Sequence, residues 1–120
     1  MAQILTIDDS ATMRQLLSTT LKDAGHEVVE AKDGVEGLQA AKGCRPKIVI
    51  TDINMPRMDG LTLIKKLREL PAYRRVPIIV LTTEIDGKKK QVAKSAGATG
   101  WITKPFDPPK LLAAIKRVLG

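Results

Sequence analysis

The sequence predicts an α/β domain built on an open parallel sheet. Along its 120 residues, short apolar runs alternate with longer stretches that carry apolar residues at helical spacing. The alternation repeats five times, and no linker, low-complexity tract or internal repeat interrupts it. We therefore expect one domain over residues 1–120, with five strands, five helices and right-handed crossovers.

Five apolar runs are the expected strands. The run from Ile48 to Thr51 contains only apolar and β-branched residues, which is typical of a strand buried on both faces. We place this strand at the centre of the sheet. The expected strands are residues 3–7, 26–30, 48–51, 76–81 and 98–103.

Each expected helix follows a residue that can start it. Glycine or proline then ends several of the helices: Gly25 ends the first, Pro71 the third and Gly97 the fourth. A basic connector, 73–75, leads from the third helix into the next strand. The residues that precede the five helices are Ser10, Asp33, Asp59, Asp86 and Asp107.

Basic residues exceed acidic ones by 20 to 13, which gives a net charge of +7. A nucleic-acid-binding module is one reading of this charge, but the chain has only one Trp, one Tyr and one Phe for base stacking. Solvated helix faces that attract acidic partners are the simpler interpretation. In the helix 87–96 we expect Val92, Ala93 and Ala96 to face the core, and the lysines to face mostly solvent. These lysines are Lys88, Lys89, Lys90 and Lys94.

The compartment that the sequence favours is the cytoplasm. No N-terminal segment resembles a secretory signal, and no apolar run approaches the roughly 20 residues that a membrane helix needs. Cys44 is the only cysteine, so no intramolecular disulfide can form.

Polar residues follow the expected strands at the point where each strand ends. Asp8 and Asp9 follow the first strand, Asp52 the third, Thr82 the fourth and Lys104 the fifth. In open parallel sheets the ligand crevice lies outside the carboxyl ends of the strands. We therefore expect these five side chains to gather at one edge of the sheet.

Three carboxylates at one edge would repel each other unless a cation lies among them. Oxygen ligands without a His or Cys cluster favour Mg²⁺, or Mn²⁺, over zinc. Mg²⁺ commonly shares its coordination with a phosphoryl oxygen, which indicates phosphate chemistry. In that chemistry Asp52 is the expected nucleophile, while Lys104 and Thr82 stabilise the transferred group.

Four separate motifs stand at the ends of the expected strands: Ile7-Asp8-Asp9-Ser10, the stretch from Asp52 to Gly60, Leu81-Thr82, and Lys104-Pro105-Phe106. Together they resemble the signature of receiver domains of two-component response regulators, closest to the stand-alone CheY-like chemotaxis type. The resemblance covers essentially the whole chain and implies a flavodoxin-like fold with strand order 2-1-3-4-5.

The resemblance also implies roles for single residues. A histidine kinase would phosphorylate Asp52, and Asp9, Asp52 and the backbone carbonyl of Asn54 would bind Mg²⁺ directly. Asp8 would bind the ion mostly through water. Thr82 would move toward the phosphoryl group and Lys104 would pair with it. The resemblance further implies a cis peptide bond between Lys104 and Pro105.

Two side chains, Asn54 and Glu84, resemble those that set the phosphoryl lifetime in chemotaxis receivers, and they predict a short-lived phosphoryl group with intrinsic autodephosphorylation. Trp101 stands where the family usually has a Tyr or another aromatic that changes rotamer on activation. Its switch role competes with simple packing at the sheet edge, and an indole lacks the hydroxyl of tyrosine.

We expect a monomeric signalling protein rather than an enzyme. The resemblance implies an output face formed by the fourth helix, fifth strand and fifth helix, with a flagellar motor switch protein or a phosphatase as partner. No effector domain follows residue 120, so we expect no DNA target, although a fragment of a longer regulator would look the same. A phosphate sink or phosphorelay intermediate is the alternative within the family.

A haloacid dehalogenase-type phosphatase is the alternative from another class. It also uses an aspartate nucleophile at a strand end, but it needs a second acid two residues later. This chain has Asn54 at that position, so the general acid/base of such an enzyme is missing.

Overall fold

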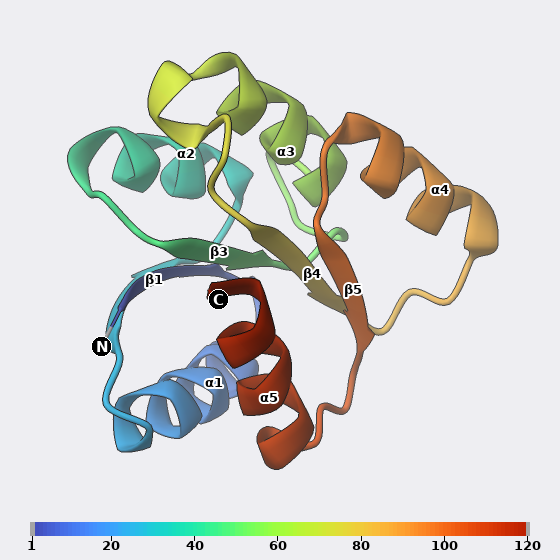
Figure 1. Cartoon of the computed structure of the whole chain (residues 1–120). Coiled ribbons are helices and arrows are strands. Elements are labelled where there is room, and N and C mark those ends of the chain that lie inside the picture. The colour runs from blue at the N-terminus through green and yellow to red at the C-terminus, as the bar shows by residue number, and fades with distance from the viewer. Residues whose placement is uncertain (1, 120) are drawn as a thin grey trace.

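The computed structural model describes residues 2–119 and contains a five-stranded parallel sheet in the order β2-β1-β3-β4-β5 (Figure 1). This confirms the predicted flavodoxin-like α/β fold. The strands are β1 (Gln3–Ile7), β2 (Glu27–Ala31), β3 (Ile48–Thr51), β4 (Ile78–Thr82) and β5 (Gly100–Thr103). The helices are α1 (Ala11–Asp23), α2 (Gly34–Gly43), α3 (Gly60–Glu69), α4 (Gly87–Ala96) and α5 (Pro108–Leu119), with a short 3₁₀ turn, η1 (Pro71–Tyr73).

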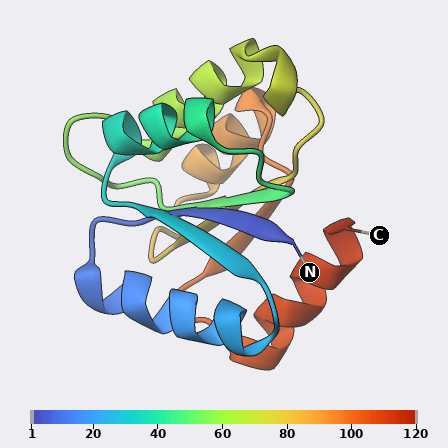
Figure 2. The ribbon, with the colours of Figure 1, turned by 90° about the vertical axis from the view of Figure 1, so that its left-hand side faces the viewer.

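Helices cover both faces of the sheet, α1 and α5 on one face and α2, α3 and α4 on the other (Figures 1 and 2). Successive residues of a strand point to opposite faces, so each strand contributes to two cores. In β3, Val49 packs with the α2–α3–α4 layer, while Ile48 and Ile50 pack with the α1–α5 layer. Every residue of β3 is buried, as predicted for the central strand.

Three helices begin at an Asp-Gly pair, and in each the aspartate side chain accepts a backbone N–H of the first turn. The glycines differ in what surrounds them. A Cβ at Gly60 would lie 2.1 Å from the carbonyl oxygen of Asp52, and one at Gly34 would lie 2.4 Å from that of Met58. Gly87 has open space at the same position of α4. The α3 start therefore requires glycine because it lies against the backbone of the sheet edge.

Strand boundaries differ from the expected ones by one or two residues. β4 begins at Ile78 rather than at residue 76, because Pro77 has no N–H to donate to a neighbouring strand. β5 begins at Gly100 rather than at residue 98, and the hydroxyl of Thr99 accepts the N–H of Ile78 ahead of the strand. β2 spans 27–31 instead of 26–30.

One expectation about side-chain burial was wrong, and one buried side chain was not anticipated. Val92 is 44% exposed, so α4 presents Ala93 rather than Val92 to the core. Tyr73, which we expected in a basic connector, is only 2% exposed because η1 turns its ring inward. Its hydroxyl donates to the carbonyl of Ala41 at 2.6 Å and so ties η1 to the last turn of α2.

Of the helices between residues 2 and 119, none combines the length and the apolar character that crossing a membrane requires.

Candidate functional site

Three carboxylates meet where β1 and β3 end. Asp8, Asp9 and Asp52 each offer an oxygen that lies within 4.8 Å of the others. The pairing of β1 with β3 produces this arrangement, because Ile7 is in register with Thr51 and the next residue of each strand is an aspartate. Asp8 is 2% exposed and Asp52 is 7% exposed, while Asp9 faces solvent.

Lys104 reaches this cluster from the end of β5. Its Nζ lies 2.6 Å from Oδ2 of Asp8 and 2.8 Å from Oδ2 of Asp52. The other oxygen of each carboxylate accepts a backbone N–H, from Ser10 at 2.9 Å and from Ile53 at 2.6 Å. The cluster is thus held by one ammonium group and two backbone donors. The Lys104-Pro105 bond that follows is cis, as the resemblance implies.

Burial and hydrogen bonding have opposite effects on the pKa values of the groups in the cluster. It raises the pKa of the Asp8 carboxyl, and hydrogen bonds from Lys104 and Ser10 only partly offset this effect. Burial alone would lower the pKa of Lys104, but hydrogen bonds to Asp52 and Asp8 outweigh it and raise that pKa above its ordinary value. Lys104 therefore stays positively charged at neutral pH and compensates the acidic cluster.

The loop after Asp52 is fixed by contacts on both sides. The N–H of Gly60 donates to the carbonyl of Ile53 at 2.8 Å, which closes the loop on itself. Arg57 has a positive φ of 66°, and its guanidinium donates to both oxygens of Asp33, at 2.9 and 3.2 Å. This two-point pair anchors the strained residue to the start of α2.

The end of β4 contributes a second group of polar contacts. Thr82 is fully buried, whereas Thr83 is exposed, and the N–H of Glu84 donates to the Thr82 hydroxyl at 3.2 Å. The carboxylate of Glu84 accepts from the side-chain amide of Asn54 at 3.4 Å and from Lys89 at 2.9 Å. The predicted pair Asn54 and Glu84 is therefore in contact, and a lysine of α4 joins it.

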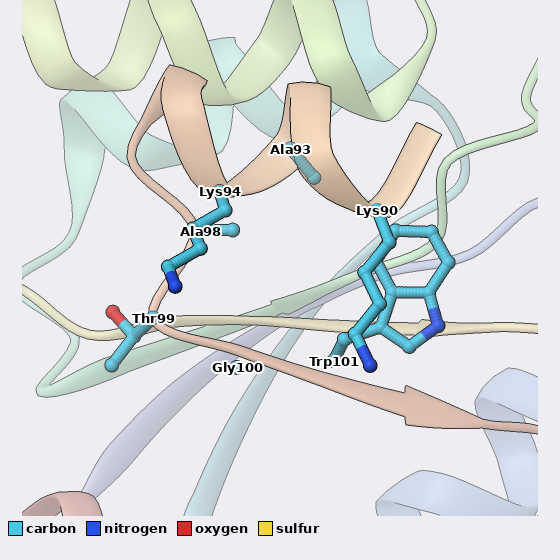
Figure 3. A pocket seen from close by; sticks show the side chains of 7 residues that line it. All are labelled: Lys90, Ala93, Lys94, Ala98, Thr99, Gly100 and Trp101. Atoms are coloured by element: carbon cyan, nitrogen blue, oxygen red, sulfur yellow. The ribbon is translucent and has the colours of Figure 1, made fainter. Parts of the chain in front are cut away.

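Trp101 lies on β5 away from the acidic cluster. It is partly buried and packs against the core beneath α4. Together with residues of α4 it lines a pocket of about 230 Å³ that Figure 3 shows in close-up. Two lysines of α4 belong to the pocket's rim. The lining residues are Lys90, Ala93, Lys94, Ala98, Thr99, Gly100 and Trp101.

The residues at the acidic cluster fit a hard divalent cation. Carboxylate oxygens are the ligands that Mg²⁺ and Mn²⁺ prefer, and the cluster contains no imidazole or thiolate that would favour zinc. Asp9 is exposed, so the cluster is accessible from solvent on that side. Among residues 2–119, Oδ1 of Asp8 and Oδ1 of Asp52 each accept one backbone N–H, so each can also bind a cation.

Sequence reasoning missed three residues that shape the site. Arg14 donates to the carbonyl of Asp8 at 2.7 Å, Arg57 pairs with Asp33, and Lys89 pairs with Glu84. Arg14 could have been found, because it lies one helical turn after the capping Ser10. The other two contacts join segments whose relative placement depends on loop geometry, which no local pattern encodes.

Known proteins that resemble this chain share its fold. A family model described as "Response regulator receiver domain" matches residues 4–116. Chemotaxis protein CheY1 of Helicobacter pylori is 43% identical over 98% of this chain and 97% of its own length. The structure of Vibrio cholerae CheY4 is 47% identical, covers 98% of both chains and has a TM-score of 0.94.

A second similar structure carries a metal. It is the receiver domain of sensor histidine kinase PA1611 from Pseudomonas aeruginosa, described as having a magnesium ion coordinated in the active site cleft. It is 26% identical, covers 99% of this chain and 98% of its own, and has a TM-score of 0.92. The chain with the Asp8–Asp9–Asp52 cluster therefore belongs to the response regulator receiver domains, and it is of the CheY-like chemotaxis type.

Proposed function

We propose that the chain, as one receiver domain over residues 1–120, is a Mg²⁺-dependent signalling switch that accepts a phosphoryl group on Asp52. The observation that carries the proposal is the position of Lys104, which lies within 2.8 Å of an oxygen of Asp52 while Asp8 and Asp9 lie beside it. One nucleophile, one mobile cation and two further metal ligands are the groups that phosphoryl transfer needs.

The transfer step requires no general base, because the Asp52 carboxylate is the attacking group. An oxygen of Asp52 attacks the phosphorus of a kinase phosphohistidine. The new P–O bond forms as the P–N bond breaks, and the bonding electron pair leaves with the imidazole nitrogen. Lys104 then pairs with a phosphoryl oxygen, and the Thr82 hydroxyl turns from the N–H of Glu84 to donate to another.

Asp9, Asp52 and the backbone carbonyl of Asn54 would hold Mg²⁺, with Asp8 acting mostly through water. When bound, the ion supplies positive charge to the phosphoryl oxygens. The magnesium ion in the cleft of the PA1611 receiver supports this assignment.

Phosphorylation would act on the surface formed by α4, β5 and α5. Thr82 ends β4 and Trp101 lies on the neighbouring strand β5, and we propose that the Trp101 rotamer reads out phosphorylation. We propose a cytoplasmic monomer that receives its phosphoryl group from a histidine kinase and controls a flagellar motor switch protein or a phosphatase. The CheY names of the relatives support a role in chemotaxis.

The lysines of α4 give the output partner an expected charge. Lys90 and Lys94 flank the pocket beside Trp101, so an acidic partner segment would be attracted there (Figure 3). Binding of the motor switch protein should weaken as the salt concentration rises. An affinity that does not change with salt would argue against this contribution of the lysines.

The proposal is tested by incubating the protein with Mg²⁺ and acetyl phosphate and measuring its intact mass. The natural sequence should gain one labile phosphoryl group, and Asp52→Asn should gain none. Omission of Mg²⁺ should prevent the gain. If the natural sequence acquires no phosphoryl group, or if Asp52→Asn acquires one equally well, the proposed acceptor is wrong.

A further inference from the structure

Glu84 connects three parts of the site. Its Oε1 accepts from Lys89 Nζ at 2.9 Å and from the Asn54 amide at 3.4 Å, while its Oε2 accepts the N–H of Asp86 at 3.3 Å. Its own N–H donates to the Thr82 hydroxyl. The Glu84 carboxylate thus joins the loop after Asp52 to the start of α4, and the Glu84 backbone N–H adds a contact to the end of β4.

We propose that Lys89 is a positioning residue that holds the Glu84 carboxylate against Asn54 and thereby sets the lifetime of the phosphoryl group on Asp52. The inference rests on the proposed function and adds to it a residue of α4 that does not contact the acidic cluster directly.

Lys89 makes the strongest of the contacts to this carboxylate. Its bond to Glu84 is charge-assisted and 0.5 Å shorter than the Asn54 contact, 2.9 against 3.4 Å. It is also the first cause of the lowered pKa of Glu84. The two other contacts to the carboxylate are neutral and long, at 3.4 Å from the Asn54 amide and 3.3 Å from the N–H of Asp86, so removing Lys89 loosens the carboxylate against Asn54.

The pair is too exposed to matter much for folding. The side chains of Lys89 and Glu84 are 43% and 21% exposed, and ion pairs in such positions contribute little to stability. The ion pair therefore affects mainly the placement of the Glu84 side chain. A positioning role predicts that loss of Lys89 changes the decay rate of the phosphoryl group but not the stability of the fold, and experiment can measure the two separately.

Hydrolysis is the step that this placement affects. A water molecule attacks the phosphorus, the P–O bond to Asp52 breaks, and the electron pair returns to the carboxylate. Inorganic phosphate leaves and the proton of the water goes to phosphate or solvent. Asn54 and Glu84 come from the loops after β3 and β4, two adjacent strands, and can hydrogen-bond a water at the phosphoryl group. A released Glu84 leaves that water less well oriented, so hydrolysis slows.

The test follows decay of the phosphoryl group by intact mass after acetyl phosphate has been removed. Lys89→Met should slow decay about threefold, a modest effect for two residues in contact. Lys89→Arg, which keeps the charge, should restore most of the natural rate. Lys65→Met, which removes an exposed lysine from α3, is the matched control and should decay at the natural rate.

A double-mutant cycle provides the decisive comparison. Lys89→Met combined with Glu84→Ala should decay at the same rate as Glu84→Ala alone, because Lys89 acts only through the Glu84 side chain, which alanine removes. The urea unfolding midpoint of Lys89→Met should remain that of the natural sequence. If the phosphoryl group decays at the natural rate in Lys89→Met, the role of Lys89 is wrong while the proposed function stands. The same holds if the double variant slows decay by the product of the two single effects. If the natural sequence gains no phosphoryl group, the proposed function fails and this inference fails with it.

Discussion

The Lys104 ammonium group lies 2.8 Å from Oδ2 of Asp52 and so occupies the position of a counter-ion for the acidic cluster. Its side chain is only 8% exposed, and the same nitrogen also contacts Asp8. A divalent ion bound to these carboxylates would compete with Lys104 for the same negative charge. Lysine and metal are therefore coupled through Asp8 and Asp52.

Replacing Lys104 with Met should increase the affinity for Mg²⁺. The substitution removes a positive charge near the metal position, and charges at such separations interact by several kcal/mol at an effective dielectric constant of about 20. After solvent screening we expect roughly tenfold tighter binding, which corresponds to about 1.4 kcal/mol. Isothermal titration calorimetry measures the change, with exposed Lys110→Met as the control. Unchanged or weaker binding would show that Lys104 and the metal are not in competition.

Gly60 should be irreplaceable, whereas Gly87 should not. A Cβ at Gly60 would lie 2.1 Å from the carbonyl oxygen of Asp52 and 2.8 Å from Cα of Ile53, so Gly60→Ala must displace the backbone of the acceptor. We expect a loss of about 3 kcal/mol in unfolding free energy, together with slower phosphoryl transfer.

Gly87→Ala is the matched control, since Gly87 also follows a capping aspartate and has open space around it. It should be neutral or stabilising by about 0.5 kcal/mol. Urea unfolding and phosphorylation rates test both variants, and equal effects at the two positions would contradict the steric argument.

The gathering of Asp8, Asp52 and Lys104 at one edge could be predicted from the sequence pattern, whereas the strand order was implied only by the resemblance to receiver domains. Each follows an apolar run, and parallel strands place their carboxyl ends on the same side. The burial of Tyr73 could not be predicted. Arginines follow it in the sequence, and only the 3₁₀ turn directs its ring into the core between α2 and β4.

Tyr73→Phe should destabilise the fold by about 1 kcal/mol without changing the phosphorylation of Asp52. The substitution leaves the carbonyl of Ala41 without its 2.6 Å donor, and such a loss has this magnitude for a neutral hydrogen bond. Burial raises the pKa of the Tyr73 hydroxyl, which therefore remains a donor at neutral pH. Denaturant unfolding and acetyl phosphate labelling provide the two readouts. A variant as stable as the natural sequence would mean that water replaces the lost donor.

The pair of Asp33 and Arg57 was also beyond sequence reasoning. The aspartate was predicted as a helix cap, which it is, but the arginine comes from a loop 24 residues away in sequence. The positive φ of Arg57 has no sequence signal, because glycine or asparagine is the usual residue in that conformation. The loop after Asp52 takes this shape because the guanidinium is held at α2.

Arg57→Met should reduce stability at neutral pH, and the reduction should disappear in acid. The hydrogen bonds from Arg57 hold the pKa of Asp33 below its ordinary value of 3.8. A carboxyl with a depressed pKa in the folded state contributes stability above its unfolded pKa, and this contribution is lost as the pH falls through the folded pKa. The difference in urea midpoint between the variant and the natural sequence should therefore be constant from pH 7 to about pH 5 and shrink below about pH 4.

Arg75→Met removes an exposed arginine from the connector and should show no such pH dependence. A difference that persists unchanged at pH 3 would mean that Arg57 stabilises the loop through its packing and not through the charge of Asp33.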